Sequence, residues 1–472
     1  MARANTRTAW QRRGARACVG PLCGLRAEIG VEPLEAGSAK IAYVAISSDI
    51  IHNGHVNIIE EAARYGEVLV GLLTDEAVAA YKRLPLLDFD SRKRLLESIR
   101  HVGRVVPQEE LSYARNLRRY RPDFVVHGDD WRAGLQMAVR KEVVEVLGEY
   151  GGRLVEVPYT NGVSGSALEA ALRPLVTTVD SRRGRLRRLL RHKPYVRAIE
   201  ASNGLSGLIV ESLQVADEGT GAVREFDAMW VSSLCDSSFK GKPDIELVDL
   251  TSRLATINEI MEVTTKPIIL DGDTGGRIEH FAYTVRTLER LGVSAVIIED
   301  KTGLKQNSLF GTDALQVLED PDEFARKVNA GKQHQVTTDF MVVARVESLI
   351  AGAGMDDALG RARTYVEAGA DGIMIHSREK DGREIAEFLS LFKAAYPDIP
   401  VVLVPTSYNH ITEDELCRMG ASVVIHANHL LRSAYPAMLG TARTILESGR
   451  SREADDRLMP ISEVLSLIPG EA

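Results

Sequence analysis

From Pro194 onward, short apolar runs alternate with helical patterns, and this rhythm limits the fold more than any other feature. Between the later runs lie amphipathic segments such as IEHFAYTVRTLERLG, DDALGRARTYVEAGA and EIAEFLSLFKAAYP. Runs this rich in Val, Ile and Leu are typical of strands buried on both faces. The eight candidate strands are VRAIEA, DAMWVSS, KPIILDGD, SAVIIED, FMVVARVE, DGIMIHS, IPVVLVPTS and ASVVIHA. Eight strands with helical crossovers predict a (β/α)₈ TIM barrel over residues 194–472.

Polar residues gather where these strands end. The carboxyl ends of barrel strands converge on one mouth, where active sites lie. Several carboxylates at one point predict a divalent cation, and Mg²⁺ suits hard oxygen ligands. Arginine and histidine in the same mouth predict a phosphorylated or carboxylated small molecule as substrate. The strand-end residues are Trp230, Ser232, Ser233, Asp271, Asp273, Glu299, Lys301, Arg345, Glu347, His376, Thr406 and Asn409.

Two motifs in the barrel are specific enough to indicate a family. Residues 299–311 read EDKTGLKQNSLFG and residues 270–276 read LDGDTGG. Together with WVSSL, VARVES, MIHS, VPTSYN and HANH in this order, they resemble the phosphoenolpyruvate mutase family of the isocitrate lyase superfamily, from about residue 185 to 465. The KKCGH loop of the lyases is not in the sequence, which argues against lyase chemistry. Related phosphonopyruvate hydrolases have Thr where this chain has Asn307, so Asn307 favours a mutase over a hydrolase.

The resemblance implies a role for each residue of the barrel mouth. The Mg²⁺ ligands, direct or through water, would be Asp271, Asp273, Glu299 and Glu347. The substrate would be bound by Trp230, Ser232, Ser233, Leu234, Ser308, Arg345 and His376. Catalysis would fall to Asp244, Lys305 and Asn307, where Asp244 matches the phosphoryl-accepting aspartate and the other two lie on a lid that excludes water. The chain departs from the family at Ser233, where Gly is common, and at Gly272, where Ala is common.

Residues 40–175 repeat the strand–helix alternation on a smaller scale. Candidate strands are IAYVAISSD, EVLVGLLTD, RPDFVVHGDD and RLVEVPYT, and candidate helices are HVNIIEEAARYG, SRKRLLESIRHV and AVRKEVVEVLGEYG. This order predicts a Rossmann-like parallel sheet. An HxGH sequence, His52 to His55, falls between the first strand and the first helix. Free backbone N–H groups there can bind phosphate, and two imidazoles can stabilise charge that develops during transfer.

HxGH alone is short, and a metal site or two surface histidines would explain it equally well. Its setting adds weight, because HNGHVNIIEEA, HGDDW and TNGVSGS make residues 49–166 resemble the small cytidylyltransferases. By this resemblance His52 and His55 stabilise the transition state. Departures at Ile46, Ser47, Tyr159 and Gly165 leave open a scaffold or a nucleotide-sensing module. The implied nucleotide-binding residues are Asp49, Gly54, Lys82, Arg92, Asp129, Asp130, Trp131 and Ser164.

The combination of the two domains is informative in itself. It resembles the fused mutase–cytidylyltransferase enzymes of fosfomycin-type phosphonate antibiotic biosynthesis. The resemblance implies that the barrel converts phosphoenolpyruvate to phosphonopyruvate, and that the N-terminal domain transfers CMP from CTP to a hydroxyalkyl phosphonate, with 2-hydroxyethylphosphonate as the expected acceptor. It also implies Mg²⁺ at both sites and a homo-oligomer, either a dimer or a tetramer.

The remaining features are less specific. A net charge of −8 and the lack of an apolar run near ~20 residues argue against nucleic-acid and membrane partners. Four scattered cysteines are expected to be reduced thiols of a cytoplasmic protein. The Arg-rich residues 1–39 are predicted to be a disordered extension, and the basic residues 176–193 a solvated linker helix.

Overall fold

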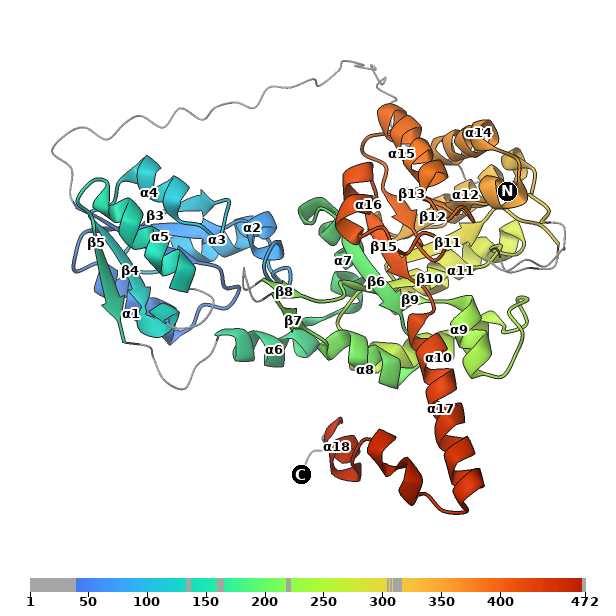
Figure 1. Cartoon of the computed structure of the whole chain (residues 1–472). Coiled ribbons are helices and arrows are strands. Elements are labelled where there is room, and N and C mark those ends of the chain that lie inside the picture. The colour runs from blue at the N-terminus through green and yellow to red at the C-terminus, as the bar shows by residue number, and fades with distance from the viewer. Residues whose placement is uncertain are drawn as a thin grey trace, which may run out of the picture. The chain divides into compact units, whose positions relative to one another are not determined.

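The computed structural model describes residues 40–132, 137–158, 165–217, 222–303, 305, 308 and 316–468. This part of the chain contains a five-stranded parallel sheet, a closed barrel of eight parallel strands and a two-stranded hairpin (Figure 1). The two predicted architectures are therefore confirmed. The predicted disordered extension, residues 1–39, lies outside the described residues.

The N-terminal sheet has the strand order β3-β2-β1-β4-β5. Its strands are β1 (Ile41–Ile46), β2 (Glu67–Leu73), β3 (Val102–Gln108), β4 (Phe124–Gly128) and β5 (Arg153–Val157). Sequence reasoning missed β3, because the apolar spacing of the preceding helix runs into it. The order reverses between β1 and β4, and the crevice outside the strand ends at such a point is where parallel sheets bind ligands.

Helices cover both faces of this sheet. They are α1 (Asn53–Ala62), α2 (Asp75–Ala79), α3 (Phe89–Glu97), α4 (Ala114–Tyr120) and α5 (Met137–Gly148), with the short 3₁₀ helix η1 (Asp129–Arg132) after β4. The helix α6 (Gly165–Val176) follows β5 along the chain. Side chains of β1 alternate between two apolar clusters, since Val44 and Ile46 pack on one face and Tyr43 on the other. An alternation with both faces buried is what a doubly wound sheet requires.

The barrel closes in the order β10-β11-β12-β13-β14-β15-β6-β9. Every strand matches one of the eight runs read from the sequence. Their bounds are β6 (Val196–Glu200), β9 (Ala228–Val231), β10 (Ile268–Asp271), β11 (Ala295–Glu299), β12 (Met341–Val346), β13 (Gly372–Ile375), β14 (Val401–Leu403) and β15 (Val423–His426). The hairpin between β6 and β9 consists of β7 (Val215–Ala216) and β8 (Val223–Arg224).

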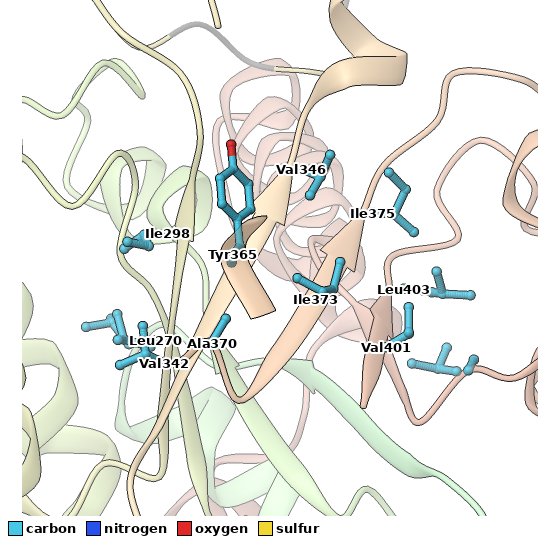
Figure 2. Packing of buried hydrophobic residues seen from close by; sticks show 14 of the residues in the cluster. Leu270, Ile298, Val342, Val346, Tyr365, Ala370, Ile373, Ile375, Val401 and Leu403 are labelled. Carbon is cyan, nitrogen blue, oxygen red and sulfur yellow. The ribbon is translucent and has the colours of Figure 1, made fainter. Parts of the chain in front are cut away.

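The barrel strands divide their side chains between two cores. In β11, Ala295 and Ile297 join the cluster inside the barrel, whereas Val296 and Ile298 join the cluster between the strands and the surrounding helices. Figure 2 shows part of this outer cluster, where strand side chains gather near Tyr365. Because the side-chain period of a strand is two, the residue that follows Ile297 by two positions faces the inside again.

The surrounding helices are α8 (Gly204–Ser212), α9 (Ser233–Phe239), α10 (Leu250–Val263), α11 (Ile278–Leu291), α12 (Pro321–Gln333), α13 (Ser348–Ala351), α14 (Met355–Glu367), α15 (Arg383–Ala395) and α16 (Glu413–Met419). The helix α17 (His429–Ser448), which buries none of its residues, the 3₁₀ helix η3 (Arg452–Arg457) and α18 (Ile461–Ser466) follow. No helix in the described ranges combines the length and apolarity that a bilayer crossing requires.

The predicted basic linker is α7 (Val179–His192), and its helical character is confirmed. The prediction that it is solvated is wrong. Leu186 and Leu189 are buried and belong to the cluster inside the barrel, and the Arg183 side chain is buried and donates to the carbonyl of Glu289. The dense charge of the segment concealed an apolar stripe at helical spacing, which is long enough to pack against the barrel.

Candidate functional site

The inner side of the barrel changes from apolar to polar at the carboxyl end of each strand. Glu299 continues the inward series of Ala295 and Ile297, and Arg345 continues that of Met341 and Val343. The residues that surround a cavity of about 60 Å³ at this end include Trp230, Ser232, Ser233, Leu234, Asp244, Asp271, Glu299, Lys305, Ser308, Arg345, His376 and Asn428. Eleven of these twelve were identified from the sequence, and Asn428 was not.

One half of the mouth is acidic. Asp271 accepts hydrogen bonds from the backbone N–H of Ser233 (3.2 Å) and from its hydroxyl (2.8 Å). The ammonium of Lys305 lies 3.0 Å from Asp244 Oδ1 and also contacts Asp273 and the Ser233 hydroxyl. Burial opposes ionisation of Asp271, yet the cations Lys305 and Arg253 hold its pKa below the ordinary value. Asp271 is therefore ionised at neutral pH.

Arg253 was not anticipated from the sequence. It lies on α10, where it donates to Asp273 Oδ2 at 2.9 Å and to the carbonyl of Val231 at 3.2 Å. Nothing in the helix pattern distinguishes it from a surface arginine, although only 5% of it is exposed. Only the crossing of α10 behind the strand ends brings it to the carboxylates.

The other half of the mouth is centred on Arg345. Its guanidinium reaches Glu347 Oε1 at 2.6 Å, Glu299 Oε2 at 3.2 Å and the Ser308 hydroxyl at 2.7 Å. Lys301 adds a second cation, 3.3 Å from Glu299 and 3.4 Å from Glu347. The geometry suits an anion, because Lys301 and Arg345 both donate to the hydroxyl oxygen of Ser308.

Glu299 and His376 in this half both have a pKa that departs from the ordinary value. Burial raises the pKa of Glu299 to about 7, and Glu347 adds to the rise, against the opposing effect of Arg345. Burial also lowers the pKa of His376, and Arg345 lowers it further. His376 Nδ1 lies 3.2 Å from Glu347 Oε1. The imidazole is therefore neutral at pH 7.

The donor set of the mouth fits Mg²⁺. Neither carboxylate oxygen of Glu299 accepts a hydrogen bond from any residue that the structure describes. No three His, Cys, Asp or Glu side chains in those residues converge closely enough to hold a metal directly. Mg²⁺ usually takes only one or two carboxylates and keeps several waters. Asp271 as a direct ligand, with Asp273, Glu299 and Glu347 reached through water, satisfies that requirement.

Asp300, which sequence reasoning did not single out, supports the basic half from behind. Its Oδ1 accepts from the backbone N–H of Glu347 at 2.9 Å, and its own N–H donates to the carbonyl of Arg345 at 3.1 Å. Tyr365 and Arg361 of α14 donate to its Oδ2 at 2.6 and 3.2 Å. Asp300 lies in the EDK sequence. Because it follows Ile298 by two positions, its side chain points outward as that of Ile298 does, and it holds the strand ends together instead of facing the cavity.

The histidines of the N-terminal domain lie at the reversal point of the sheet. His52 is the N-cap of α1, where its Nδ1 accepts from Gly54 N at 3.1 Å and its backbone N–H donates to His55 Nδ1 at 3.4 Å. The two rings are 4.1 Å apart. Burial lowers the pKa of His55 to about 4, with His52 and Lys82 contributing. The pair is thus neutral at pH 7 and lies at the start of a helix, where backbone N–H groups favour anions.

The other residues expected at the nucleotide site differ in their location and in their partners. Trp131 follows β4 on the other side of the reversal point, stacks on His127 with ring centroids 3.8 Å apart, and donates to Glu156. Arg92 is buried, and its Nη2 is paired with Asp75 at 2.7 Å. Its Nε and Nη1 have no hydrogen-bond partner among the described residues.

Asp49 is buried after β1, with Oδ2 accepting from Leu86 N. Lys82 lies near enough to His55 to influence its charge. Asp129 and Asp130 form the first turn of η1. Ser164 and, in the barrel, Asn307 lie outside the described residues.

The fold and the two sites define a two-domain enzyme, in which a barrel with a metal-and-anion mouth is joined to an HxGH nucleotidyltransferase domain. A family model described as phosphoenolpyruvate phosphomutase matches residues 186–446, and one described as cytidylyltransferase-like matches residues 47–171. Since the first match covers more than half of the chain, the chain belongs to the phosphoenolpyruvate phosphomutase family. It is an isomerase of the mutase type that also carries a nucleotidyltransferase domain.

Individual relatives agree with this assignment. A phosphoenolpyruvate phosphomutase of Tetrahymena pyriformis is 37% identical over 283 residues, which are 60% of this chain and 89% of the relative. The crystal structure of a phosphoenolpyruvate phosphomutase from Streptomyces platensis subsp. rosaceus covers 60% of this chain and 93% of its own, with 35% identity and a TM-score of 0.54. A phosphonopyruvate hydrolase in complex with oxalate and Mg²⁺ covers 60% and 94%, with 32% identity and a TM-score of 0.52.

Proposed function

We propose that the barrel, residues 194–472, interconverts phosphoenolpyruvate and phosphonopyruvate with Mg²⁺. We further propose that residues 40–175 transfer CMP from CTP to a hydroxyalkyl phosphonate, with 2-hydroxyethylphosphonate as the acceptor, in a fosfomycin-like pathway. The observation that carries the first proposal is the division of one mouth into an acidic half around Asp271 and a basic half around Arg345. A substrate with a carboxylate, an enol oxygen and a phosphoryl group needs both halves together.

The chain's own residues can carry the rearrangement. Arg345 and Lys301 hold the phosphoryl oxygens, since both already direct N–H groups at the Ser308 hydroxyl. The P–O bond of phosphoenolpyruvate breaks to leave the pyruvate enolate, and the P–C bond forms at the enolate methylene carbon. Asp244 faces the cavity, where it can take the phosphoryl group between these events or shield it from water. Mg²⁺, when bound at Asp271, supplies positive charge to the enolate oxygen.

The mutase activity is tested most easily in the direction of phosphoenolpyruvate, because formation of the carbon–phosphorus bond is uphill. Purified protein with Mg²⁺ and phosphonopyruvate is expected to yield phosphoenolpyruvate in phosphorus NMR. Asp244→Ala should abolish turnover, whereas the exposed Asp398→Ala should not. Release of pyruvate and inorganic phosphate instead would identify a hydrolase and overturn the proposal.

The N-terminal activity has a separate test. The neutral histidine pair beside the reversal point supports nucleotidyl transfer, because both rings stand at a helix start that can receive a triphosphate. Incubation with CTP, Mg²⁺ and 2-hydroxyethylphosphonate should give a phosphonate–phosphate diester and pyrophosphate. His52→Ala should stop this reaction, and the exposed His280→Ala should not. CTP binding without pyrophosphate release would instead indicate a nucleotide-sensing domain.

A further inference from the structure

Asn428 lines the barrel mouth but belongs to neither its acidic half nor its basic half. It directly precedes α17, borders the cavity, and is only 5% exposed. Its Oδ1 has no hydrogen-bond partner among the residues that the structure describes. A buried polar group without a partner costs free energy, so few such groups persist without a function. The Asn428 carboxamide is therefore available to a molecule that enters the cavity.

The freedom of this side chain is unusual, because Asn428 is the N-cap residue of α17. An N-cap asparagine ordinarily accepts a hydrogen bond from the backbone N–H of the second or third helical residue. Within α17, all of which the structure describes, the Asn428 side chain makes no such bond. The N–H groups of Leu430 and Leu431, at these two positions, instead donate to Glu200 Oε1, the second at 3.1 Å. Glu200 thus caps the helix in place of Asn428.

Glu200 can cap α17 because of its place at the end of β6. Ala198 belongs to the cluster inside the barrel, so Glu200, two positions later, also faces the inside, and only 1% of it is exposed. Since β6 pairs with β15, a side chain at the end of β6 meets the chain that leaves β15. The Cys235 thiol of α9 holds the same segment from another side, with the carbonyl of Ala427 as its acceptor at 3.4 Å.

The order of the strands determines which part of a substrate Asn428 can meet. In the closed barrel β15 is three strands away from β12, which carries Arg345, and β6 lies opposite β12. Ser232 and Ser233 follow β9, the next strand after β6. A substrate whose phosphoryl group is bound at Arg345 therefore extends its other anionic group, the carboxylate, toward this side. A carboxamide offers two N–H donors, and a hydrogen bond to a carboxylate is charge-assisted.

We propose that Asn428 binds the carboxylate of the substrate, and that Glu200 is a positioning residue that caps α17 and so frees the Asn428 side chain for this contact. The assignment deepens the proposed function and rests on it, because it gives one group of the proposed substrate to one residue. Asn428 takes part in binding and not in the transfer of the phosphoryl group. Its loss should therefore affect KM and ligand affinity far more than kcat.

The first experiment measures steady-state kinetics with phosphonopyruvate and Mg²⁺. Asn428→Ala should raise KM about tenfold or more and change kcat by less than about threefold. Asn428→Asp fills the same space but replaces the donor by an anion, so KM should rise at least as much. Asn258→Ala, at an exposed position of α10, should change neither constant. Turnover with an unchanged KM in Asn428→Ala would overturn the assignment and leave the proposed function intact.

The second experiment needs no turnover. Calorimetry measures the affinity of the full-length chain for oxalate, a small dicarboxylate without a phosphoryl group, in the presence of Mg²⁺. Asn428→Ala should weaken oxalate binding about fivefold or more, and this result would support the carboxylate contact even if the wild type showed no mutase turnover. A raised KM with unchanged oxalate affinity would place Asn428 at the phosphoryl group and overturn the assignment. A wild type that does not bind oxalate would refute both the contact and the proposed substrate.

The role of Glu200 is tested by rescue. Glu200→Gln keeps an oxygen acceptor for the two N–H groups and should keep KM within about threefold of the wild type. Glu200→Ala removes the acceptor, so the Asn428 side chain turns back to cap α17 and KM should rise about as much as in Asn428→Ala. Because both residues act through one contact, the double variant should be no worse than either single variant. Effects on KM that multiply, or a normal KM in Glu200→Ala, would refute the positioning role.

Asn428→Ala also tests the capping without any change at Glu200, in case Glu200→Ala does not fold. Its midpoint of urea unfolding should equal that of the wild type, because the Asn428 side chain makes no capping bond. A lower midpoint together with a normal KM would identify Asn428 as a structural cap and overturn the proposal.

Discussion

Gly272 separates the two aspartates of the acidic half and stands where the family commonly has Ala. A Cβ at this position would lie 2.7 Å from Val296 Cγ2, 2.9 Å from Ile298 Cγ2 and 3.0 Å from the carbonyl oxygen of Ile297. All three atoms belong to β11, the neighbouring strand in the barrel. Two branched side chains therefore fill the space that a methyl group would need. Gly272→Ala should overpack the barrel at this point.

The expected size follows from these distances. Extra methyl groups in a packed core cost about 1–3 kcal/mol. Replacing Gly by Ala lowers the conformational entropy of the unfolded chain, and this stabilises the folded state by about 0.4–1 kcal/mol. The 2.7 Å approach to Val296 Cγ2 places the overpacking cost in the upper half of that range, about 2–3 kcal/mol, so the net loss for Gly272→Ala should be about 1–2.6 kcal/mol. Val296→Ala removes the nearest methyl group, so the double variant should be more stable than the sum of the single changes by about 1 kcal/mol or more.

Urea unfolding followed by tryptophan fluorescence gives the free energy of unfolding of the wild type, the two single variants and the double variant. The four values are compared at the unfolding transition of the barrel, which Trp230 reports. A loss below about 0.5 kcal/mol for Gly272→Ala would refute the reasoning. So would single effects that add in the double variant within about 0.3–0.5 kcal/mol. Either result would mean that β11 yields to the methyl group without strain.

Three further predictions concern single groups. Tyr365→Phe removes a hydrogen bond to the buried Asp300 and should cost about 1.5–3 kcal/mol in urea unfolding, whereas the exposed Tyr435→Phe should stay within about 0.5 kcal/mol. Burial lowers the pKa of His55 from its ordinary value of 6.5 to about 4 in the folded chain, so the unfolded chain binds more protons between these values. Stability should therefore fall by up to about 3 kcal/mol as the pH drops from 6.5 to 4, and a titration of His55→Asn that keeps this slope would contradict the assignment. Arg345→Lys should lower kcat/KM for phosphonopyruvate by roughly a hundredfold, because a compact ammonium cannot reproduce the fixed planar spread of the guanidinium donors toward Glu299, Glu347 and Ser308, and near-normal kinetics would remove the guanidinium from the mechanism.

Much of the fold could be predicted because its signals are local. The eight barrel strands were each visible as an apolar run, and the polar residues at the ends of these runs indicated which side chains meet at the barrel mouth. Glu299 and Arg345 are examples. The errors arose where a local signal was ambiguous or masked, as in β3, which follows a helical pattern without a break, and in α7, where arginines concealed the buried Leu186 and Leu189.

The partners of the site could be predicted only in part. Arg253 and Tyr365 come from helices whose patterns mark nothing beyond an amphipathic surface. Their hydrogen bonds to Asp273 and Asp300 join residues far apart in the chain. No spacing rule within one element could have found them.

The sequence by itself determined the kinds of element, their order, and the side chains that end each barrel strand, because propensity and periodicity act over a few residues. Only the tertiary structure decided which charges meet. Closure of the barrel and the path of the chain after β11 bring Lys305 to Asp244 and Asp273, and Ser308 between Lys301 and Arg345. Electrostatic pairing depends on distance in space, and that distance is set when the sheet closes, not by separation along the chain.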